Sequence, residues 1–213
     1  YRDVIRQLKA DGPIDGDKLL DHYFNILEEI ERIIVEHKLI SLPERDAGIR
    51  IATEAETAAQ PAPHLDIPRL IGNTGEYPYF VIPQLQQNDD GSWQQTDDTY
   101  VAGSWTLTAH EARPGHEMQF SSILESGVSI TRAIFAFNSA NVEGWGLYSE
   151  AIMKEHLPLE GQFFTLYMRL LRAARAFLDP MLNLGQLQPA DAKAFLIREL
   201  RLSEPMATQE VDR

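Results

Sequence analysis

The segment Thr108-Ala-His-Glu-Ala-Arg-Pro-Gly-His116 decides how the central part of this chain folds. The surrounding pattern is helical, but Pro114-Gly115 disrupts regular helix. On an unbroken helix, His110 and His116 would be rotated apart by about 240° and could not bind the same ion. A bulge or wide turn would return both imidazoles to one side. We therefore predict that the helix is distorted at residues 112–115.

The same segment carries the donors of a catalytic metal site. Neutral imidazole is the commonest protein ligand for a catalytic metal, so His110 and His116 are candidate metal ligands. Glu111 directly follows the first histidine, where a zinc hydrolase keeps its general base. A metal-bound water can be ionised near neutral pH, and a base beside it can take its proton. This pattern indicates metal-assisted hydrolysis.

A second segment, Asn141-Val-Glu-Gly-Trp-Gly-Leu-Tyr148, contains a candidate third ligand. Glu143 follows His116 by 27 residues. Glu150 lies seven residues further on, on the same helical face, and could be the ligand instead. Glu143 is favoured because Gly144 and Gly146 permit a close backbone approach next to it. Tight helix packing is the alternative explanation of these two glycines.

Each residue also has a structural interpretation. A single histidine in a helical protein is usually on the surface or at a helix end, and Glu143 could be a solvated helix carboxylate. Trp145, Leu147 and Ile152 fit a buried helix stripe without any ligand role. Together, however, the residues favour a metal site. Two histidines and one carboxylate also suit non-haem iron, but Glu111 favours zinc because a hydrolase needs that base.

Length and composition describe a globular chain. Its 213 residues are 44% hydrophobic and 24% charged, which is compatible with one domain that has a sizeable core. The net charge of −13 argues against nucleic acid and anionic lipid as partners. No run of 18 apolar residues is present, so we expect no membrane span. The absence of cysteine excludes disulfides and thiolate ligands.

The pattern along the chain predicts a mainly α fold with a small antiparallel β element in residues 45–105. Apolar residues at three- and four-residue steps predict a helix over 17–37, and further helices are expected from about 138 and over 159–184. Pro180 should end or kink the last of these early. Residues 49–52 and 79–82 are the strand candidates, 88–92 form a turn, and Pro189 and Ser203 begin the two final helices.

The remaining histidines have no partner at ligand spacing. We expect His22 and His37 on helix surfaces, His64 in a loop, and His156 in a structural role near a helix end. The chain begins at Tyr1 inside a helical pattern, and it ends without a helix-stop signal. We therefore expect a single domain over 1–213 that is the C-terminal catalytic part of a longer chain, truncated at both ends.

The two motifs, HEARPGHEMQ followed by NVEGWGLYSE, resemble those of the bacterial domain-of-unknown-function 885 family, HE-x-x-PGH-x-x-Q and EGW-[AG]-LY-x-E. The resemblance is strong over about Trp105 to Arg213. It implies a multi-helix zincin-like catalytic domain, related in style to the gluzincin zinc peptidases. It also implies that His110, His116 and Glu143 bind Zn²⁺ and that Glu111 is the base.

The resemblance gives Gln119 a supporting role beside the ligands, while Glu117 stands where many members have another histidine. It favours the bacterial periplasm or export over the cytoplasm. The expected substrate is a peptide or a small amide. For the oxyanion, Arg113, Tyr100 and Tyr148 are the candidate stabilisers.

Three other functions stay open from the sequence. The chain could be a non-catalytic peptide-binding or interaction module with a structural or vestigial metal site, for which Glu150 or His156 would complete four protein ligands. It could be a metal-independent helical module, in which case the helix would continue through Pro114-Gly115. It could also hydrolyse a non-peptide amide or ester. Substrate specificity and oligomeric state are not determined by the sequence.

Overall fold

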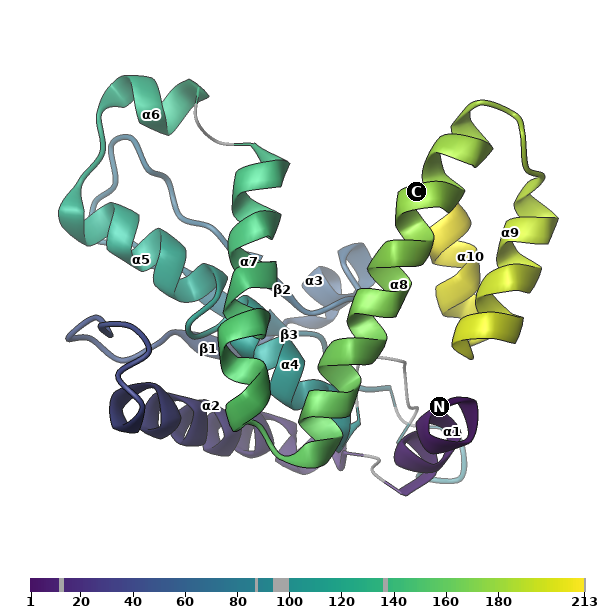
Figure 1. Ribbon diagram of the computed structural model, residues 1–213. Coiled ribbons are helices and arrows are strands. Elements are labelled where there is room, and N and C mark those ends of the chain that lie inside the picture. The colour runs from purple at the N-terminus through teal and green to yellow at the C-terminus, as the bar shows by residue number, and fades with distance from the viewer. Residues whose placement is uncertain (12–13, 87, 94–99, 136–137, 213) are drawn as a thin grey trace.

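The computed structural model describes residues 1–11, 14–86, 88–93, 100–135 and 138–212. The fold is mainly helical with one small sheet (Figure 1). The helices are α1 (Arg2–Asp11), η1 (Gly16–Lys18), α2 (Leu19–Glu36), α3 (Glu54–Ala59), α4 (Val101–Glu111), α5 (His116–Ser126), α6 (Ile130–Phe135), α7 (Ser139–Met153), η2 (Lys154–His156), α8 (Leu159–Asn183), α9 (Pro189–Phe195), η3 (Leu196–Leu200) and α10 (Glu204–Asp212). The strands are β1 (Ile49–Ile51), β2 (His64–Asp66) and β3 (Tyr79–Ile82).

Helix α2 confirms the amphipathic helix that the sequence predicts. One face carries the apolar residues at three- and four-residue steps, and these side chains are buried. Tyr23 and Leu27 pack toward the sheet, against Phe80 of β3. Ile30 and Ile34 pack beneath α4 and the end of α7. Helix α2 thus forms the base on which the central helices lie (Figure 1).

The sheet contains both predicted strands but is mixed, with strand order β1-β3-β2. β1 and β3 are parallel, with Ile49 opposite Phe80, so the β element is present but is not purely antiparallel as predicted. A parallel pair needs a long connection, and more than a dozen residues separate the two strands. β2 supplies the antiparallel neighbour, with His64 opposite Val81. His64 therefore lies in a strand and not, as expected, in a loop.

Helix α4 lies at the centre and packs against α2, α7 and α8 (Figure 1). Its buried residues are mostly small: Ala102, Gly103, Ser104, Thr106, Thr108 and Ala109. Small side chains let three helices approach one axis. Thr106 Oγ1 lies 2.8 Å from Thr165 Oγ1 of α8, which satisfies two buried hydroxyls between these helices. Other helices therefore surround the C-terminal end of α4, where His110 and Glu111 lie.

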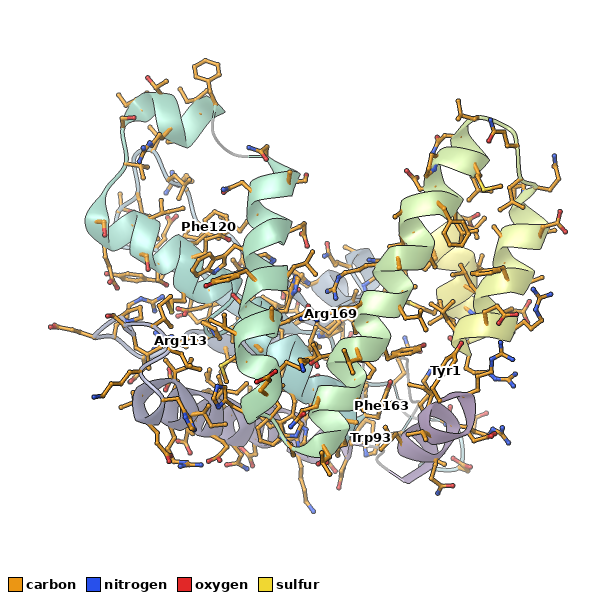
Figure 2. The ribbon with its side chains drawn as sticks, viewed as in Figure 1. Tyr1, Trp93, Arg113, Phe120, Phe163 and Arg169 are labelled. Atoms are coloured by element: carbon orange, nitrogen blue, oxygen red, sulfur yellow. The ribbon has the colours of Figure 1, made fainter. Side chains whose placement is uncertain are left out.

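Helices α7 and α8 begin where the sequence predicts. The Asn138 side chain caps α7 by accepting from Asn141 N at 2.9 Å. α8 continues through Pro180 to Asn183, so the expected early end is wrong. Leu178 before Pro180 and Leu182 after it both pack against the C-terminal helices, which favours the continued helix. Figure 2 shows the side chains of α8, α9 and α10 filling the space between these helices.

The chain ends in a small helical layer on α8. Pro189 occupies the first turn of α9, and the Ser203 hydroxyl caps α10, both as predicted. The turn at residues 88–92 is also present, closed by Asn88 N donating to Ser92 O at 2.8 Å. Among the described residues, no helix is both long enough and apolar enough to cross a membrane.

Candidate metal centre

A tight turn separates the two histidines of the first motif. α4 ends at Glu111 and α5 begins at His116, which confirms the predicted distortion at 112–115. The peptide bond between Arg113 and Pro114 is cis. A Cβ on Gly115 would lie 1.8 Å from the carbonyl oxygen of His110, so only glycine fits there. The proline and the glycine thus allow the chain to turn back on the end of α4.

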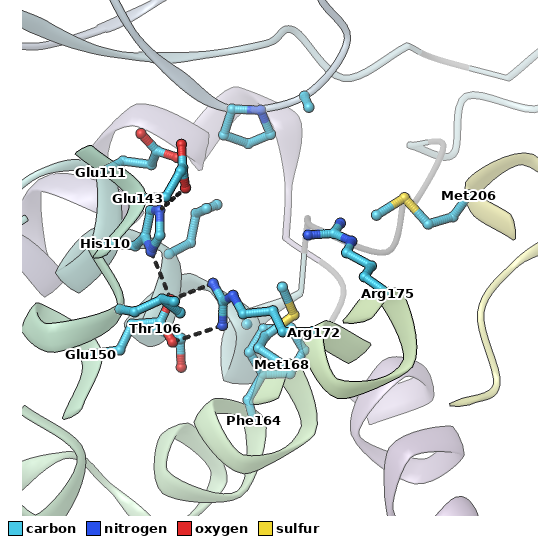
Figure 3. A pocket seen from close by; sticks show the side chains of 15 residues that line it. Thr106, His110, Glu111, Glu143, Glu150, Phe164, Met168, Arg172, Arg175 and Met206 are labelled. Atoms are coloured by element: carbon cyan, nitrogen blue, oxygen red, sulfur yellow. Dashed lines mark hydrogen bonds and ion pairs between the residues drawn. The ribbon is translucent and has the colours of Figure 1, made fainter. Parts of the chain in front are cut away.

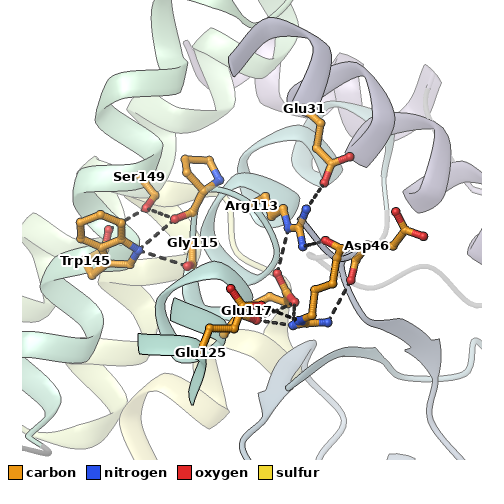
Figure 4. A network of polar contacts seen from close by, with 11 residues as sticks. Glu31, Asp46, Arg113, Gly115, Glu117, Glu125, Trp145 and Ser149 are labelled. Carbon is orange, nitrogen blue, oxygen red and sulfur yellow. Dashed lines mark hydrogen bonds and ion pairs between the residues drawn. The ribbon is translucent and has the colours of Figure 1, made fainter. Parts of the chain in front are cut away.

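Side chains of helix α7 form hydrogen bonds to one side of this turn (Figure 4). Trp145 Nε1 donates to the carbonyl oxygens of Pro114 at 2.9 Å and Gly115 at 3.1 Å. The Ser149 hydroxyl donates to the Pro114 carbonyl at 3.1 Å. A turn leaves backbone carbonyls without helical partners, and these side chains satisfy them. The EGWGLYSE motif therefore contacts the HEARPGH motif directly.

A buried ionic network fastens the turn from the other side (Figure 4). Arg113 is 2% exposed and donates to Glu117 at 3.0 Å, to Glu31 of α2 at 2.6 Å and to the Arg45 carbonyl at 2.7 Å. The Arg45 side chain donates to Glu117 and to Ser121. Arg113 therefore points away from the histidines into the interior. It is not positioned as the oxyanion stabiliser that the sequence made a candidate.

His110, His116 and Glu143 come together at the turn. One donor atom from each of the three side chains lies within 4.8 Å of the others. The rings of His110 and His116 are edge to face with centroids 4.7 Å apart, and His110 Nε2 lies 3.5 Å from a Glu143 carboxylate oxygen. Among the described residues, this is the one group of three or more His, Asp and Glu side chains with such spacing.

The other ring nitrogen of each histidine is already used. His110 Nδ1 lies 2.7 Å from Glu150 Oε1, and Glu150 also accepts two hydrogen bonds from Arg172 at 2.6 and 2.9 Å. His116 Nδ1 lies 3.3 Å from Gln119 Oε1. Such partners set the tautomer and the orientation of a metal-binding imidazole. Both Nε2 atoms are therefore left as the donors for an ion, and the donor set fits zinc.

The two glycines of α7 differ in what surrounds them. A Cβ on Gly146 would lie 2.5 Å from His110 Cε1 and 2.7 Å from its Nε2, so the imidazole occupies the space above this glycine. A Cβ on Gly144 would meet no atom within 4 Å. The predicted close approach is thus confirmed at Gly146 and absent at Gly144.

The electrostatics of the group favour a cation. Burial alone would lower the pKa of His110, but hydrogen bonds to Glu143 and Glu150 raise that pKa to about 9. Burial, with the negative charges of Glu143 and Glu150, raises the pKa of Glu111 to about 7. Burial and the charge of His110 lower the pKa of His116. The cluster of carboxylates therefore attracts positive charge, which a proton or a metal ion can supply.

His110, Glu111, Glu143 and Glu150, but not His116, open into a cavity of about 560 Å³ (Figure 3). His110, Glu111 and Glu143 line one wall, and α8 contributes the opposite wall. Apolar side chains cover much of the surface between them; they include Leu107, Leu147, Phe164 and Met168. The volume falls in the range of small-molecule sites. His110, Glu143 and Glu111 are therefore accessible from one cavity.

Tyr100 and Tyr148 do not line this cavity, so the structure does not support either as an oxyanion stabiliser. Tyr100 is buried in the core against Phe164, and Tyr148 is 56% exposed beside Trp145. His22 is not a surface residue as expected, because its Nε2 lies 2.8 Å from Ser104 Oγ of α4.

His156 contacts the exposed His37, with ring centroids 4.2 Å apart. It does not belong to the three-residue donor group. The expected structural role of His156 is consistent with this placement, and His37 lies on the surface as expected.

Sequence reasoning missed three contributions of α7 and α8. The sequence makes Glu150 a candidate ligand, in place of Glu143 or as a fourth protein ligand, and does not predict its contact with His110 Nδ1. A buried helix stripe is the structural interpretation of Trp145, and it does not predict that the indole N–H bonds the turn, although that N–H requires an acceptor. Arg172 had no signal at all, because its partner Glu150 lies 22 residues away on another helix.

Comparison with known proteins identifies the family. No curated protein matches the chain. The structure is similar to a "putative lipoprotein of unknown function" from Shewanella oneidensis, with TM-score 0.79 and 20% identity over 98% of this chain and 37% of that one. It is also similar to a "putative lipoprotein" from Colwellia psychrerythraea, with TM-score 0.75 and 20% identity over 95% of this chain and 34% of that one.

The chain therefore spans a little over a third of the length of these two structures, which show its fold. The family model described as "Bacterial protein of unknown function (DUF885)" matches residues 1–213. The chain belongs to this bacterial family, DUF885.

Proposed function

We propose that this protein is a zinc-dependent hydrolase that cleaves the amide bonds of peptides. One observation carries the proposal: a turn of four residues brings His110 and His116 together, and α7 brings Glu143 to them. Three protein donors with an adjacent cavity are the arrangement of a catalytic zinc site. A structural zinc site has four protein ligands, and the described residues supply three here. A metal-independent module is disfavoured because the helix is broken at 112–115.

Zinc bound to this group would supply a Lewis acid that lowers the pKa of a water molecule and polarises a carbonyl group. Glu111 is the general base in this proposal. It follows the ligand His110 directly, lines the same cavity, and has a pKa near 7 because of burial and its acidic neighbours. A carboxylate in this pKa range can take a proton from water and return it to the leaving amine near neutral pH.

The residues around the ligands keep this geometry. Glu150 and Arg172 orient His110, and Gln119 contacts His116. Trp145 bonds the turn that separates the two histidines. These contacts reduce the movement of the donors, which an accurately built site requires. We further propose an exported or cell-envelope location, because both structures compared are named as lipoproteins.

The test is hydrolysis of a mixture of internally quenched peptides by the wild type and by Glu111→Gln. The variant should keep its metal content and lose roughly 10²–10⁴-fold in rate. Glu155→Gln is the control, because Glu155 is 81% exposed on η2 and does not line the cavity. Undiminished turnover in Glu111→Gln would exclude this mechanism.

A further inference from the structure

The cavity wall formed by α8 differs in polarity and charge from the wall that carries His110 and Glu111. Phe164, Met168, Arg172 and Arg175 all line the cavity at steps of four, four and three residues, so they occupy one face of the helix. The face is apolar at its start and cationic at its end. The opposite wall, with Glu111, is acidic. The cavity is therefore polarised from one end to the other.

The two arginines on this face are not equivalent. Arg172 uses both Nη atoms to bind Glu150, which in turn holds His110. Both Nη atoms of Arg172 are therefore occupied by the carboxylate that also contacts His110. Arg175 instead binds Glu210 of α10 through Nε and Nη2, at 2.5 and 2.6 Å. Its Nη1 has no hydrogen-bond partner among the residues that the structure describes.

The two side chains of the Arg175–Glu210 ion pair differ in solvent exposure. The Glu210 side chain is 2% exposed, whereas the Arg175 side chain is 37% exposed. Figure 3 shows the Arg175 guanidinium extending from α8 toward the hollow, beyond Arg172 as seen from His110. A guanidinium has five N–H donors in a planar fork, and Glu210 engages only one edge of it. The buried carboxylate thus holds the arginine in place while the other edge faces the cavity.

We infer that Arg175 anchors a carboxylate of the substrate in this cavity. This inference rests on the proposed hydrolase function and names its substrate class: short peptides that carry a carboxylate away from the cleaved bond. At the metal end, Arg172 and the proposed zinc ion offset the charges of Glu111, Glu143 and Glu150. At the other end, the N–H donors of Arg175 that Glu210 does not use are available to a carboxylate, so Arg175 orients the substrate. The apolar middle of the cavity accommodates the side chains between the two ends.

The test measures binding, so it does not require catalysis. Three dansyl-labelled tripeptides of the same length serve as probes: one of glycine and leucine with a free C-terminal carboxylate, its C-terminal amide, and an amide with glutamate as its last residue. Fluorescence anisotropy gives their affinities for the protein in a Glu111→Gln background, which prevents cleavage. A carboxylate probe should bind about 10–100-fold more tightly than the plain amide, as expected for a charge-assisted contact.

Arg175→Met should abolish this preference, and Arg32→Met should not, because Arg32 is an ion-paired arginine on the exposed face of α2. Since Arg175→Met leaves the buried Glu210 charge uncompensated, the double variant with Glu210→Gln is measured beside it. Glu210→Gln alone, which keeps the cation, should retain the preference. Repetition after dialysis against a chelator separates this contact from coordination of the probe by a metal.

Preference for the terminal carboxylate would indicate peptide C-termini, and preference for the glutamate probe would indicate acidic side chains; both support the anchor. Equal binding of all three probes would overturn it, as would a preference that survives the loss of Arg175 or disappears with the chelator. Failure of the hydrolase proposal is seen separately, as an absence of turnover by the wild type with an intact binding preference.

Discussion

Replacement of Gly146 by alanine tests whether the imidazole of His110 must lie where the structure places it. The new Cβ would be 2.5 Å from His110 Cε1, whereas ordinary contacts begin at 3.4 Å, so the ring has to move by about 1 Å. That movement disrupts the 2.7 Å contact with Glu150 and the alignment with Glu143. Overpacking of this kind costs about 1–3 kcal/mol, and misorientation of a ligand typically costs 10–100-fold in metal affinity.

Gly144→Ala is the matched control in the same helix, since its Cβ would meet no atom within 4 Å. Both substitutions gain about 1 kcal/mol in helix propensity, so the difference between the variants isolates the clash. Zinc affinity is measured by competition with a chromophoric chelator, and stability by urea unfolding. We expect Gly144→Ala to be more stable than the wild type with the same zinc affinity, and Gly146→Ala to be impaired in both. Equal zinc affinity for the two variants would refute the reasoning.

Three further predictions concern the turn and the charges around it. Arg113→Met should destabilise the protein by about 3–5 kcal/mol in urea unfolding, because Glu117 would remain as a buried and under-compensated charge; a cost below 1 kcal/mol would contradict this. Trp145→Phe should cost about 1–3 kcal/mol, because the Gly115 carbonyl loses its donor and the Pro114 carbonyl keeps only Ser149; unchanged unfolding would contradict this. The metal-free protein should lose stability as the pH rises from about 6.5 to about 9; below 6.5 the lowered pKa of His116 acts in the opposite direction. The folded-state pKa of Glu111 is about 7 against an ordinary 4.5, and that of His110 is about 9 against 6.5, so the folded state binds more protons in both windows. Thermal unfolding in the presence of a chelator checks this sign, and a melting temperature that rises over that range would contradict it.

Local chemistry made much of the fold predictable. The apolar periodicity of α2 is a property of that segment alone, and the helix is present where the pattern indicated it. The break before His116 follows from Pro114 and Gly115, which are incompatible with regular helix. The paired motifs placed His110, His116 and Glu143 together, and the geometry has them within ligand spacing of one another.

Other features depend on contacts between distant segments. β2 is three residues long and pairs with β3 through backbone atoms, so its side chains carried no strand pattern. Arg113 turns inward because Glu31 and Glu117 meet it there, and Glu31 is 82 residues away in the sequence. Continuation of α8 through Pro180 likewise depends on tertiary burial, which outweighs the local preference of proline.

The most direct test of the central claim is the zinc content of protein purified without chelator, measured by elemental analysis beside His116→Ala. His116 is the better ligand to remove, because His110 also takes part in the Glu150–Arg172 network. The account predicts about one zinc per chain in the wild type and none in the variant, with both proteins folded. A folded wild type that contains and binds no zinc, or a variant that retains it, would contradict the account.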